Sequence, residues 1–496
     1  MASAHAQQDQ GHQARGQDQR QDEGRGSGQE GSKLRQSITG PLLFLFILGD
    51  VLGAGIYALM GVLSQEVGGA LWAPLLTALV LALLTAGSYA ELVTKYPRAG
   101  GAAIFAERAF KNPLLAFLVG FSMLAAGVTS AAGLALAFAG DYLGTFLDVP
   151  AVPAAVVFLA LVAALNARGI SESLKSNVVM TVIEVSGLLI VIVTVAVLLG
   201  HGGGDVARVT QLPDGVSPGS AVLGAAVIAY YSFVGFETSA NVAEEVRDPS
   251  RVYPRALFGA LLVAGLVYVL VGLASAIALP TAELADSSGP LLAVVAATGV
   301  GVPAWVFSLI ALVAVANGAL LTMIMASRVT YGMAEQGLLP GVLARVLPRR
   351  RTPWIAIVAT TVVAMLLTLV GDLSVLASTV VLLLLFVFIS TNVAVLVLRR
   401  DQVAHRHFRV PAPIPVLGVA SCVLLLTQQE GRVWLYGLAL LAVGVVLFAV
   451  ARLTGRRGTA AGVATGEADS GTEHQPGAGS DRGPRGRHDD EEADRT

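Results

Sequence analysis

Three acidic side chains stand deep inside apolar runs of this sequence: Asp50, Glu184 and Glu237. A carboxylate at mid-bilayer depth costs about 2.5–3.5 kcal/mol on insertion scales, so such a residue usually has a function. The histidines all lie outside these runs and no lysine lies deep within one, so a proton relay there has to use carboxyl groups. We therefore expect these three residues to act in gating or in coupling to protons.

Each of the three also has a structural alternative. Glu237 could cap a broken helix, and Asp50 could satisfy freed peptide N–H groups beside it. Glu184 could accept hydrogen bonds from nearby hydroxyl groups such as that of Thr181. A fourth acid, Glu91, lies near the end of its run, where a solvated or loop-bracing role is favoured.

The stretch around Asp50 contains glycines at positions 49, 53 and 55 in the middle of an apolar run. Glycine costs about 1 kcal/mol relative to alanine inside a helix. A helix that only had to cross lipid would avoid both the glycines and the acid. We expect the helix to unwind at Gly53-Ala54-Gly55, although glycines also allow another helix to pack closely.

A second run has the same character around Gly235, which Glu237 follows. Gly235 lies about sixteen residues into its run, and Gly53 about fifteen into its own; such paired interruptions point to a transporter binding site. Half-helix N-termini suit a carboxylate, and half-helix C-termini suit an ammonium group. Together they suit the head group of an amino acid.

The composition is that of a polytopic membrane protein. Of 496 residues, 55% are hydrophobic and 13% are charged, and the formal net charge of −2 argues against a nucleic-acid partner. The single cysteine, Cys422, lies in an apolar run and provides neither a disulfide nor a metal site. We expect no cofactor, because the sequence contains no nucleotide-binding loop, metal-ligand cluster or nucleophile motif.

About twelve apolar runs have the length needed to cross a bilayer as helices. Their approximate ranges are 38–64, 71–95, 113–145, 152–168, 174–199, 219–243, 254–279, 302–331, 353–371, 374–398, 412–428 and 433–453. The predicted fold is all-α, with interrupted helices one and six. Between spans, residues 98–110 predict a short amphipathic helix, and residues 281–298 predict a lid on the outer surface.

The chain divides into a hydrophilic tail at 1–35, a membrane domain at 36–454 and a second hydrophilic tail at 455–496. Both tails have too few apolar residues to fold, so we expect disorder. In the membrane domain, two five-span halves at about 38–199 and 219–398 predict an inverted repeat. The last two spans, about 412–453, are then peripheral.

Basic residues are distributed unequally between the two sets of loops. Loops after even-numbered spans hold about eighteen Arg and Lys residues, whereas the opposite loops hold about two, Arg208 and Arg432. This asymmetry predicts that both termini are cytoplasmic. We expect a multi-pass protein of the plasma membrane, embedded in the lipid bilayer; the sequence leaves its oligomeric state open.

Several motifs in this order resemble the amino acid–polyamine–organocation transporters, over roughly residues 38–453. They are Gly53-Ala-Gly-Ile-Tyr57, Tyr89-Ala-Glu-Leu, Pro97-Arg-Ala-Gly-Gly101, Phe233-Val-Gly-Phe-Glu237, Ala243-Glu-Glu-Val-Arg-Asp-Pro-Ser-Arg-Val-Tyr-Pro254, Ala326-Ser-Arg-Val-Thr-Tyr-Gly-Met-Ala334, Gly337-Leu-Leu-Pro340 and Phe408-Arg-Val-Pro411. The resemblance implies a leucine-transporter-type fold with alternating access and a site between spans one, three, six, eight and ten.

The resemblance also implies roles for individual residues. Ala54 and Gly55 would offer N–H groups to a substrate carboxylate, and the carbonyls of Phe233 and Val234 would take the amino group. Tyr231 would stand where relatives place an aromatic gate, and Glu237 where several place a gating or coupling acid. With the residues beside the two breaks and one amide on span eight, the expected substrate-binding set is Gly53, Ala54, Gly55, Ile56, Tyr231, Phe233, Val234, Gly235, Phe236 and Asn317.

Some of these residues have alternatives. Tyr230, Phe233 and Phe236 could be packing residues only, and Asn317 could join two helices instead of contacting substrate. Proton-coupled relatives often carry a lysine in span five, in a pattern like Asn-x-x-x-Thr-x-x-Lys. This chain has Glu184 at that position, after Asn177 and Thr181, which argues against a lysine-based coupling mechanism.

The sequence therefore predicts a secondary active transporter that moves amino acids by alternating access, as a proton-coupled symporter. Because three deep acids face no deep base, transport or exchange of an amine, polyamine or other organic cation is the alternative. A non-transporting nutrient sensor is a remote third reading. The sequence does not distinguish symport from exchange.

Overall fold

The computed structural model describes residues 38–53, 55–97, 101–168, 173–213, 215–348, 350 and 352–466, with side chains left out at 173–176 and 454–466. The predicted N-terminal tail and residues 467–496 lie outside this described part. Every regular element within it is helical, and one isolated parallel bridge joins Ile38 to Val246.

Ten helical segments are long and apolar enough to cross a membrane, counting each broken pair once. They are α2 (Gly40–Leu52) with α3 (Gly55–Val67), α4 (Trp72–Lys95), α6 (Pro113–Phe138) with α7 (Asp141–Gly144), α8 (Ala151–Arg168), α9 (Ser173–Gly200), α10 (Pro218–Tyr231) with η2 (Phe236–Glu245), α11 (Pro249–Ala278), α14 (Ala304–Glu335), α16 (Leu373–Leu398) and α18 (Gly431–Gly466).

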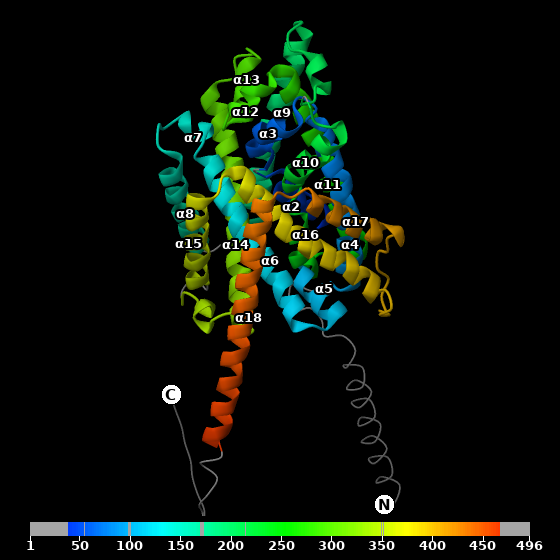
Figure 1. The fold of residues 1–496 in the computed structure, drawn as a ribbon, viewed down its shortest axis with the longest axis vertical. Coiled ribbons are helices and arrows are strands. Elements are labelled where there is room, and N and C mark those ends of the chain that lie inside the picture. Colours follow the sequence, from blue (N-terminus) through cyan, green and yellow to red (C-terminus); the bar gives the residue numbers. More distant parts are fainter. Residues whose placement is uncertain are drawn as a thin grey trace, which may run out of the picture.

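Two shorter apolar helices, α15 (Trp354–Val370) and α17 (Pro413–Thr427), occupy the two remaining predicted spans. Other short helices connect spans: α5 (Gly101–Phe110), η1 (Val206–Thr210), α12 (Thr281–Asp286), α13 (Pro290–Ala297) and η3 (Gly341–Ala344). Helix α5 forms within the segment predicted as a short helix, and α12 with α13 fill the segment predicted as a lid (Figure 1).

The helix contacts are symmetric between the two five-span halves. Helix α2 packs on α9 and α11, and α10 packs on the corresponding helices α16 and α4. Likewise α6 packs on α16, and α14 packs on α9. In the central pairs α6–α14 and α4–α11, each helix contacts its own counterpart from the other half. Because each half has five spans, the halves run in opposite directions, as an inverted repeat requires.

Helices α17 and α18 lie at the periphery, α17 against α16 and α4, and α18 against α6 and α16 (Figure 1). Helix α18 continues to Gly466, so the helix runs past the domain boundary predicted at 454.

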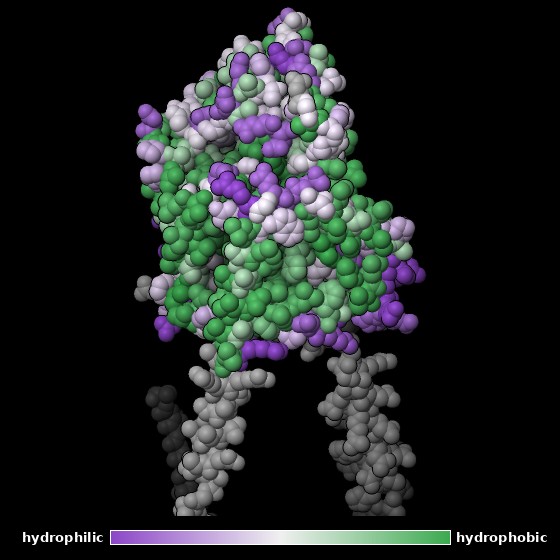
Figure 2. Space-filling model, in the orientation of Figure 1, coloured by the Kyte–Doolittle hydropathy of each residue, from purple (hydrophilic) through white to green (hydrophobic). Residues whose placement is uncertain are grey.

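The exposed surface carries many large apolar side chains. Leu161 is 60% exposed, Leu366 is 55% exposed and Leu435 is 70% exposed. On the face shown in Figure 2, residues of this kind form a broad hydrophobic band with hydrophilic residues above and below it. A band of this kind is what a protein presents to lipid acyl chains.

The lower end in Figure 1 holds α5, and we call it the basic end. Arg108 belongs to α5 and lies over the ring of Tyr96 at the end of α4, and Arg399 pairs with Glu91 near the same end of α4. Arg328 lines one cavity together with Glu107 of α5. The opposite end, which holds α3, α12 and α13, is called the far end.

Candidate functional site

The first predicted break is present. Helix α2 ends at Leu52, Gly53 has ψ −167° and so leaves the helical region, and α3 begins at Gly55. Ala54 lies outside the described residues, so its role stays a prediction. The interruption leaves the last carbonyls of α2 and the first N–H groups of α3 without intrahelical partners.

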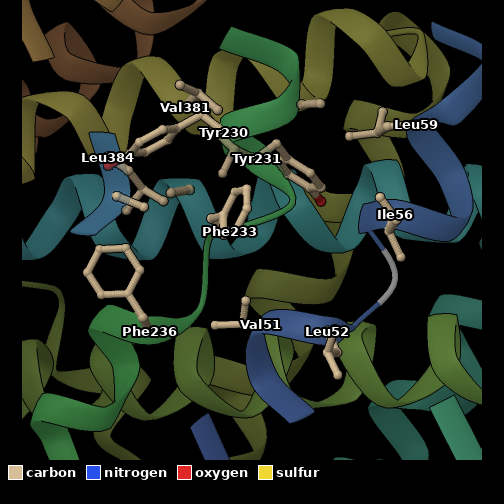
Figure 3. Packing of buried hydrophobic residues seen from close by; sticks show 14 of the residues in the cluster. Val51, Leu52, Ile56, Leu59, Tyr230, Tyr231, Phe233, Phe236, Val381 and Leu384 are labelled. Atoms are coloured by element: carbon tan, nitrogen blue, oxygen red, sulfur yellow. The ribbon is translucent and has the colours of Figure 1, made fainter. Parts of the chain in front are cut away.

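The second predicted break is present as well. Helix α10 ends at Tyr231, a turn covers Ser232–Gly235, and η2 begins at Phe236 (Figure 3). Gly235 has φ +125°, a conformation that glycine adopts readily and other residues do not. The N–H of Gly235 donates to the Glu237 carboxylate at 2.9 Å, so Glu237 caps its own broken helix.

The two breaks cross each other backbone against backbone. A Cβ atom on Gly55 would lie 3.0 Å from the Ser232 Cα, and one on Gly235 would lie 2.8 Å from the Asp50 carbonyl oxygen. Each break therefore contributes one glycine that lets the other break approach. The close approach needs glycine at both positions.

Tyr268 of α11 holds the crossing from behind. Its hydroxyl donates towards the Val51 carbonyl at 2.5 Å and the Ser232 carbonyl at 3.0 Å, and the side chain is fully buried. One hydroxyl proton is thus shared between a carbonyl at each break. Sequence reasoning missed Tyr268, because a single tyrosine in an apolar run carries no signal of its partners.

A cavity of about 860 Å³ lies beside the crossing, within the size range of small-molecule sites. The predicted site residues in its wall are Asp50, Gly53, Gly55, Tyr231, Val234, Gly235 and Glu237. The opposite wall comes from α6, α14 and α16. The cavity opens at the basic end, where the exposed residues Glu107, Arg328 and Gln336 line it.

At its closed end the cavity is bounded by Tyr231 and Ser130. Their hydroxyl groups are 2.8 Å apart, which joins the end of α10 to the middle of α6. Both side chains are buried and both line the cavity. Tyr231 therefore lines the cavity away from its mouth, and its role as an aromatic gate stays a prediction.

The far end is closed by α12 and α13. The Gln65 side chain of α3 donates to the Ala285 carbonyl at 3.0 Å. The Asp141 carboxylate accepts from the Gly289 N–H at 3.0 Å and from the Ser287 hydroxyl at 3.3 Å. These contacts fasten the lid to the ends of two core helices.

Asp50 lies in the cavity wall and accepts a hydrogen bond from the Thr238 hydroxyl. Since Thr238 belongs to η2, this contact joins α2 to the second broken helix. At the basic end the same two elements meet again, because Ile38 exchanges backbone hydrogen bonds of 3.0 Å with Glu245 and Arg247.

Glu184 and Asn317 lie behind the first break, outside the set of cavity-lining residues. The Asn317 amide donates to the Glu184 carboxylate at 3.0 Å and towards the Asn177 side chain at 3.4 Å. Among the described residues, the other oxygen of Glu184 has no hydrogen-bond partner, although the residue is fully buried. The structure therefore brings these predicted residues together with each other, apart from the cavity.

The side chains of Ile56, Phe233 and Phe236 are also buried and outside the set that lines the cavity. The Phe233 ring packs on Tyr268 with centroids 5.2 Å apart, and the Phe236 ring stacks on Phe388 at 5.4 Å (Figure 3). These three residues can therefore contact a substrate only through their backbone N–H and C=O groups.

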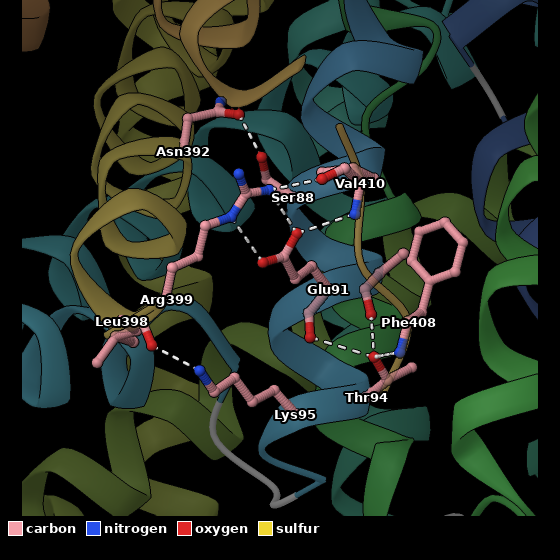
Figure 4. Close-up of polar contacts among 10 residues, drawn as sticks. Ser88, Glu91, Thr94, Lys95, Asn392, Leu398, Arg399, Phe408 and Val410 are labelled. Carbon is pink, nitrogen blue, oxygen red and sulfur yellow. Dashed lines mark hydrogen bonds and ion pairs between the residues drawn. The ribbon is translucent and has the colours of Figure 1, made fainter. Parts of the chain in front are cut away.

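Glu91 has the loop-bracing contacts that its position favours (Figure 4). Its carboxylate accepts from the Arg399 guanidinium at 2.9 and 2.8 Å and from the Val410 N–H at 3.0 Å. These bonds tie α4, the end of α16 and the segment that enters α17.

Comparisons with known proteins agree with this architecture. Residues 40–455 match the family model described as amino acid permease. The chain is 27% identical over 432 residues to the branched-chain amino acid permease BcaP of Bacillus subtilis, covering 82% of this chain and 90% of that protein.

Two further relatives differ in the solute that their names specify. The methylthioribose transporter of Bacillus subtilis is 27% identical over 452 residues, covering 85% of this chain and 95% of that protein. The vacuolar cationic amino acid transporter 4 of Arabidopsis thaliana is 30% identical over 376 residues, covering 71% of this chain and 61% of that protein.

Proposed function

Because the chain belongs to the amino acid permease family, a family of multi-pass membrane transporters and not of enzymes, we propose that it moves amino acids across the plasma membrane by alternating access, as a proton-coupled symporter. The single observation that carries the proposal is the crossing of two broken helices beside a cavity that extends to exposed residues at the basic end. Unwound backbone at membrane depth is tolerated where it lines a cavity.

The head group of the amino acid binds at the crossing. The first N–H groups of α3, at Gly55 and Ile56, and that of Ala54 receive the carboxylate, since a helix N-terminus attracts negative charge. The carbonyls of Phe233 and Val234 receive the ammonium group. In this arrangement Gly53 and Gly235 shape the backbone, and Tyr231 covers the substrate on the side of the far end.

Protons are carried by the deep carboxyl groups. Asp50 and Glu237 line the cavity and can exchange protons with it, whereas Glu184 is sealed behind the first break with Asn317. The oxygen of Glu184 that lacks a partner supports a role in binding a proton or a cation. Asp50 bridges α2 and η2, so a change in its charge alters the contact between them.

The excess of arginine at the basic end supports placing this end in the cytoplasm, together with both termini. With that orientation the cavity is open to the cytoplasm, and the lid of α12 and α13 closes the outer side. The state described is then inward-facing. Substrate taken up from outside would be released through this opening.

The test is transport by the purified protein in liposomes. An inward-directed proton gradient is expected to drive accumulation of a radiolabelled amino acid, and a proton ionophore is expected to abolish it. If no amino acid in a full panel of twenty moves or competes, the proposal is wrong.

Transport of an amine is the second candidate, and one observation favours it. The cavity wall near the crossing holds Asp50 and Glu237, and its arginine, Arg328, lies at the mouth. An amine that lacks a carboxylate would then displace binding better than its parent amino acid. The reverse order supports the first candidate.

A further inference from the structure

The cavity wall opposite the crossing is almost entirely apolar. It consists of side chains from α6, α14 and α16: Met123, Ala126, Gly127, Leu134, Leu321, Met325, Val380 and Leu384. Besides Arg328 at the mouth, the polar side chains that these helices add to the wall are Ser130 and Thr322. Ser130 is bonded to Tyr231, and the Thr322 hydroxyl donates to the carbonyls of Gly318 and Ala319 at 3.0 Å each. Both hydroxyl groups are thus engaged within the protein.

The charged side chains that line the cavity belong to the crossing or to the basic end: Asp50, Glu107, Glu237, Glu245 and Arg328. Asp50 is bonded to Thr238, and Glu237 is bonded to the Gly235 N–H, both on the side of the crossing. Glu107 and Arg328 are exposed at the mouth. A charged substrate side chain against the wall would lose its hydration without gaining a partner, which is unfavourable.

We propose that the cavity takes amino acids with an uncharged, apolar side chain, and that Gly127 sets the largest side chain admitted. The proposal rests on the amino acid transport proposed above and names the class of substrate. With its head group at the crossing, an amino acid directs its side chain between α6 and α14. Burial of apolar surface against this wall then favours aliphatic over charged side chains.

Gly127 is placed to control length. A Cβ atom there would lie 3.0 Å from the Met325 terminal methyl and 3.5 Å from the Thr322 carbonyl oxygen. The first contact is the flexible end of a methionine, which can shift. Met325 also lines the cavity, so a larger residue at 127 would displace the end of this methionine and reduce the space for a substrate side chain. The Ala326 Cβ atom would lie 3.5 Å from the added Cβ as well, so the remaining room on the side of α14 is small.

The experiment compares substrates of different size in liposomes. For the unaltered protein, valine, leucine and methionine are expected to compete with a labelled substrate, and lysine, arginine and glutamate are not. For Gly127→Val, the KM for leucine is expected to rise about tenfold with the KM for alanine within about twofold, because one or two methylene groups decide such discrimination. Gly127→Ala provides a milder variant of the same design if Gly127→Val does not accumulate.

Gly133→Ala is the matched control, since a Cβ there makes ordinary contacts of 3.5 and 3.6 Å with Leu373 and Leu376 and the position lies outside the cavity wall. It should leave both KM values unchanged. Stronger competition by lysine or arginine than by leucine would overturn the proposal, as would equal changes for alanine and leucine in the Gly127 variants. Failure to transport any amino acid would instead refute the proposed function.

Discussion

Gly235 combines two constraints at one residue: a backbone conformation at φ +125° and a backbone neighbour within contact distance of any added Cβ. We expect Gly235→Ala to abolish transport and to lower the free energy of unfolding by about 1–3 kcal/mol, the cost typical of strained backbone. Uptake in liposomes and thermal melting in detergent measure the two effects.

The control for that substitution is Gly224→Ala, on α10 of the same broken span. An added Cβ at 224 meets open space, so the replacement should be neutral or slightly stabilising. Equal loss of transport in both variants would contradict the argument from Gly235.

A substitution of Asp50 is predicted to abolish proton coupling while leaving substrate binding intact. Asp50→Asn keeps an oxygen that can accept from Thr238 but cannot gain or lose a proton. Accumulation driven by a proton gradient should be lost, whereas exchange of labelled for unlabelled substrate at equal concentrations should continue.

Asp148→Asn replaces an exposed carboxyl group in the loop before α8 and should change neither measurement. Gradient-driven uptake that survives in Asp50→Asn would assign the proton to Glu184 or Glu237 instead.

Sequence reasoning succeeded at the breaks because their cost is visible residue by residue: glycine and a carboxylate are unfavourable in an apolar helix wherever their partners lie. It could not find Tyr268 or Ser130. Their partners Val51 and Tyr231 are 217 and 101 residues away, and tyrosine or serine in an apolar run is unremarkable on its own.

The same reasoning could not predict which side chains near the breaks point toward the cavity. For Phe233, Phe236 and Asn317 it left substrate contact and packing or helix joining open, and the structure shows packing contacts for the two rings and a hydrogen bond between helices for Asn317. Helical periodicity assigns a face only within a continuous helix, and it says nothing once the chain unwinds.

At the scale of elements, side-chain hydrogen bonds hold the turn of the lid, while α12 and α13 pack on α3. Asp141 binds the turn between α12 and α13 through Gly289 and Ser287. We expect Asp141→Ala to loosen the lid, because these bonds are lost. In a background with Cys422→Ser, a cysteine placed at the buried Leu284 of α12 should react several-fold faster with a membrane-impermeant thiol reagent.

Asp286→Ala, which removes an exposed carboxyl group from α12 itself, should leave this reaction rate unchanged. A rate in Asp141→Ala equal to that in Asp286→Ala would show that the lid is held by packing alone.

The ion pair between Glu91 and Arg399 at the basic end also joins separate helices. Glu91 is almost fully buried with Arg399, so removing one partner leaves an uncompensated charge. We expect Glu91→Gln to cost about 3–5 kcal/mol of stability, as for buried ion pairs in general. Melting in detergent measures the loss, with the exposed neighbour Arg400→Gln as control. A smaller loss in a Glu91→Gln/Arg399→Gln double variant would confirm the coupling.

At the scale of the whole molecule, the positions of the apolar helices followed from the apolar runs, and the inverted repeat followed from the two breaks. In the described part of the chain, ten of the twelve predicted spans are long enough to cross a membrane, and α15 and α17 are shorter. The helix contacts exchange between halves as that repeat requires. The apolar wall could not be foreseen in the same way, because α6, α14 and α16 have apolar residues all round with polar residues scattered among them, and only their packing selects the side that meets the cavity.

The close packing at Gly55 and Gly235 separates two tasks of a transport protein: holding the two broken helices together and selecting the substrate side chain. Because the close contact of the two breaks is made by main-chain atoms, side chains in the opposite wall of the cavity can be changed without altering it. A protein engineer could therefore alter substrate preference by substituting side chains in the apolar wall of α6, α14 and α16. Gly55 and Gly235 would have to be kept in every such variant, because losing either one would disrupt the crossing.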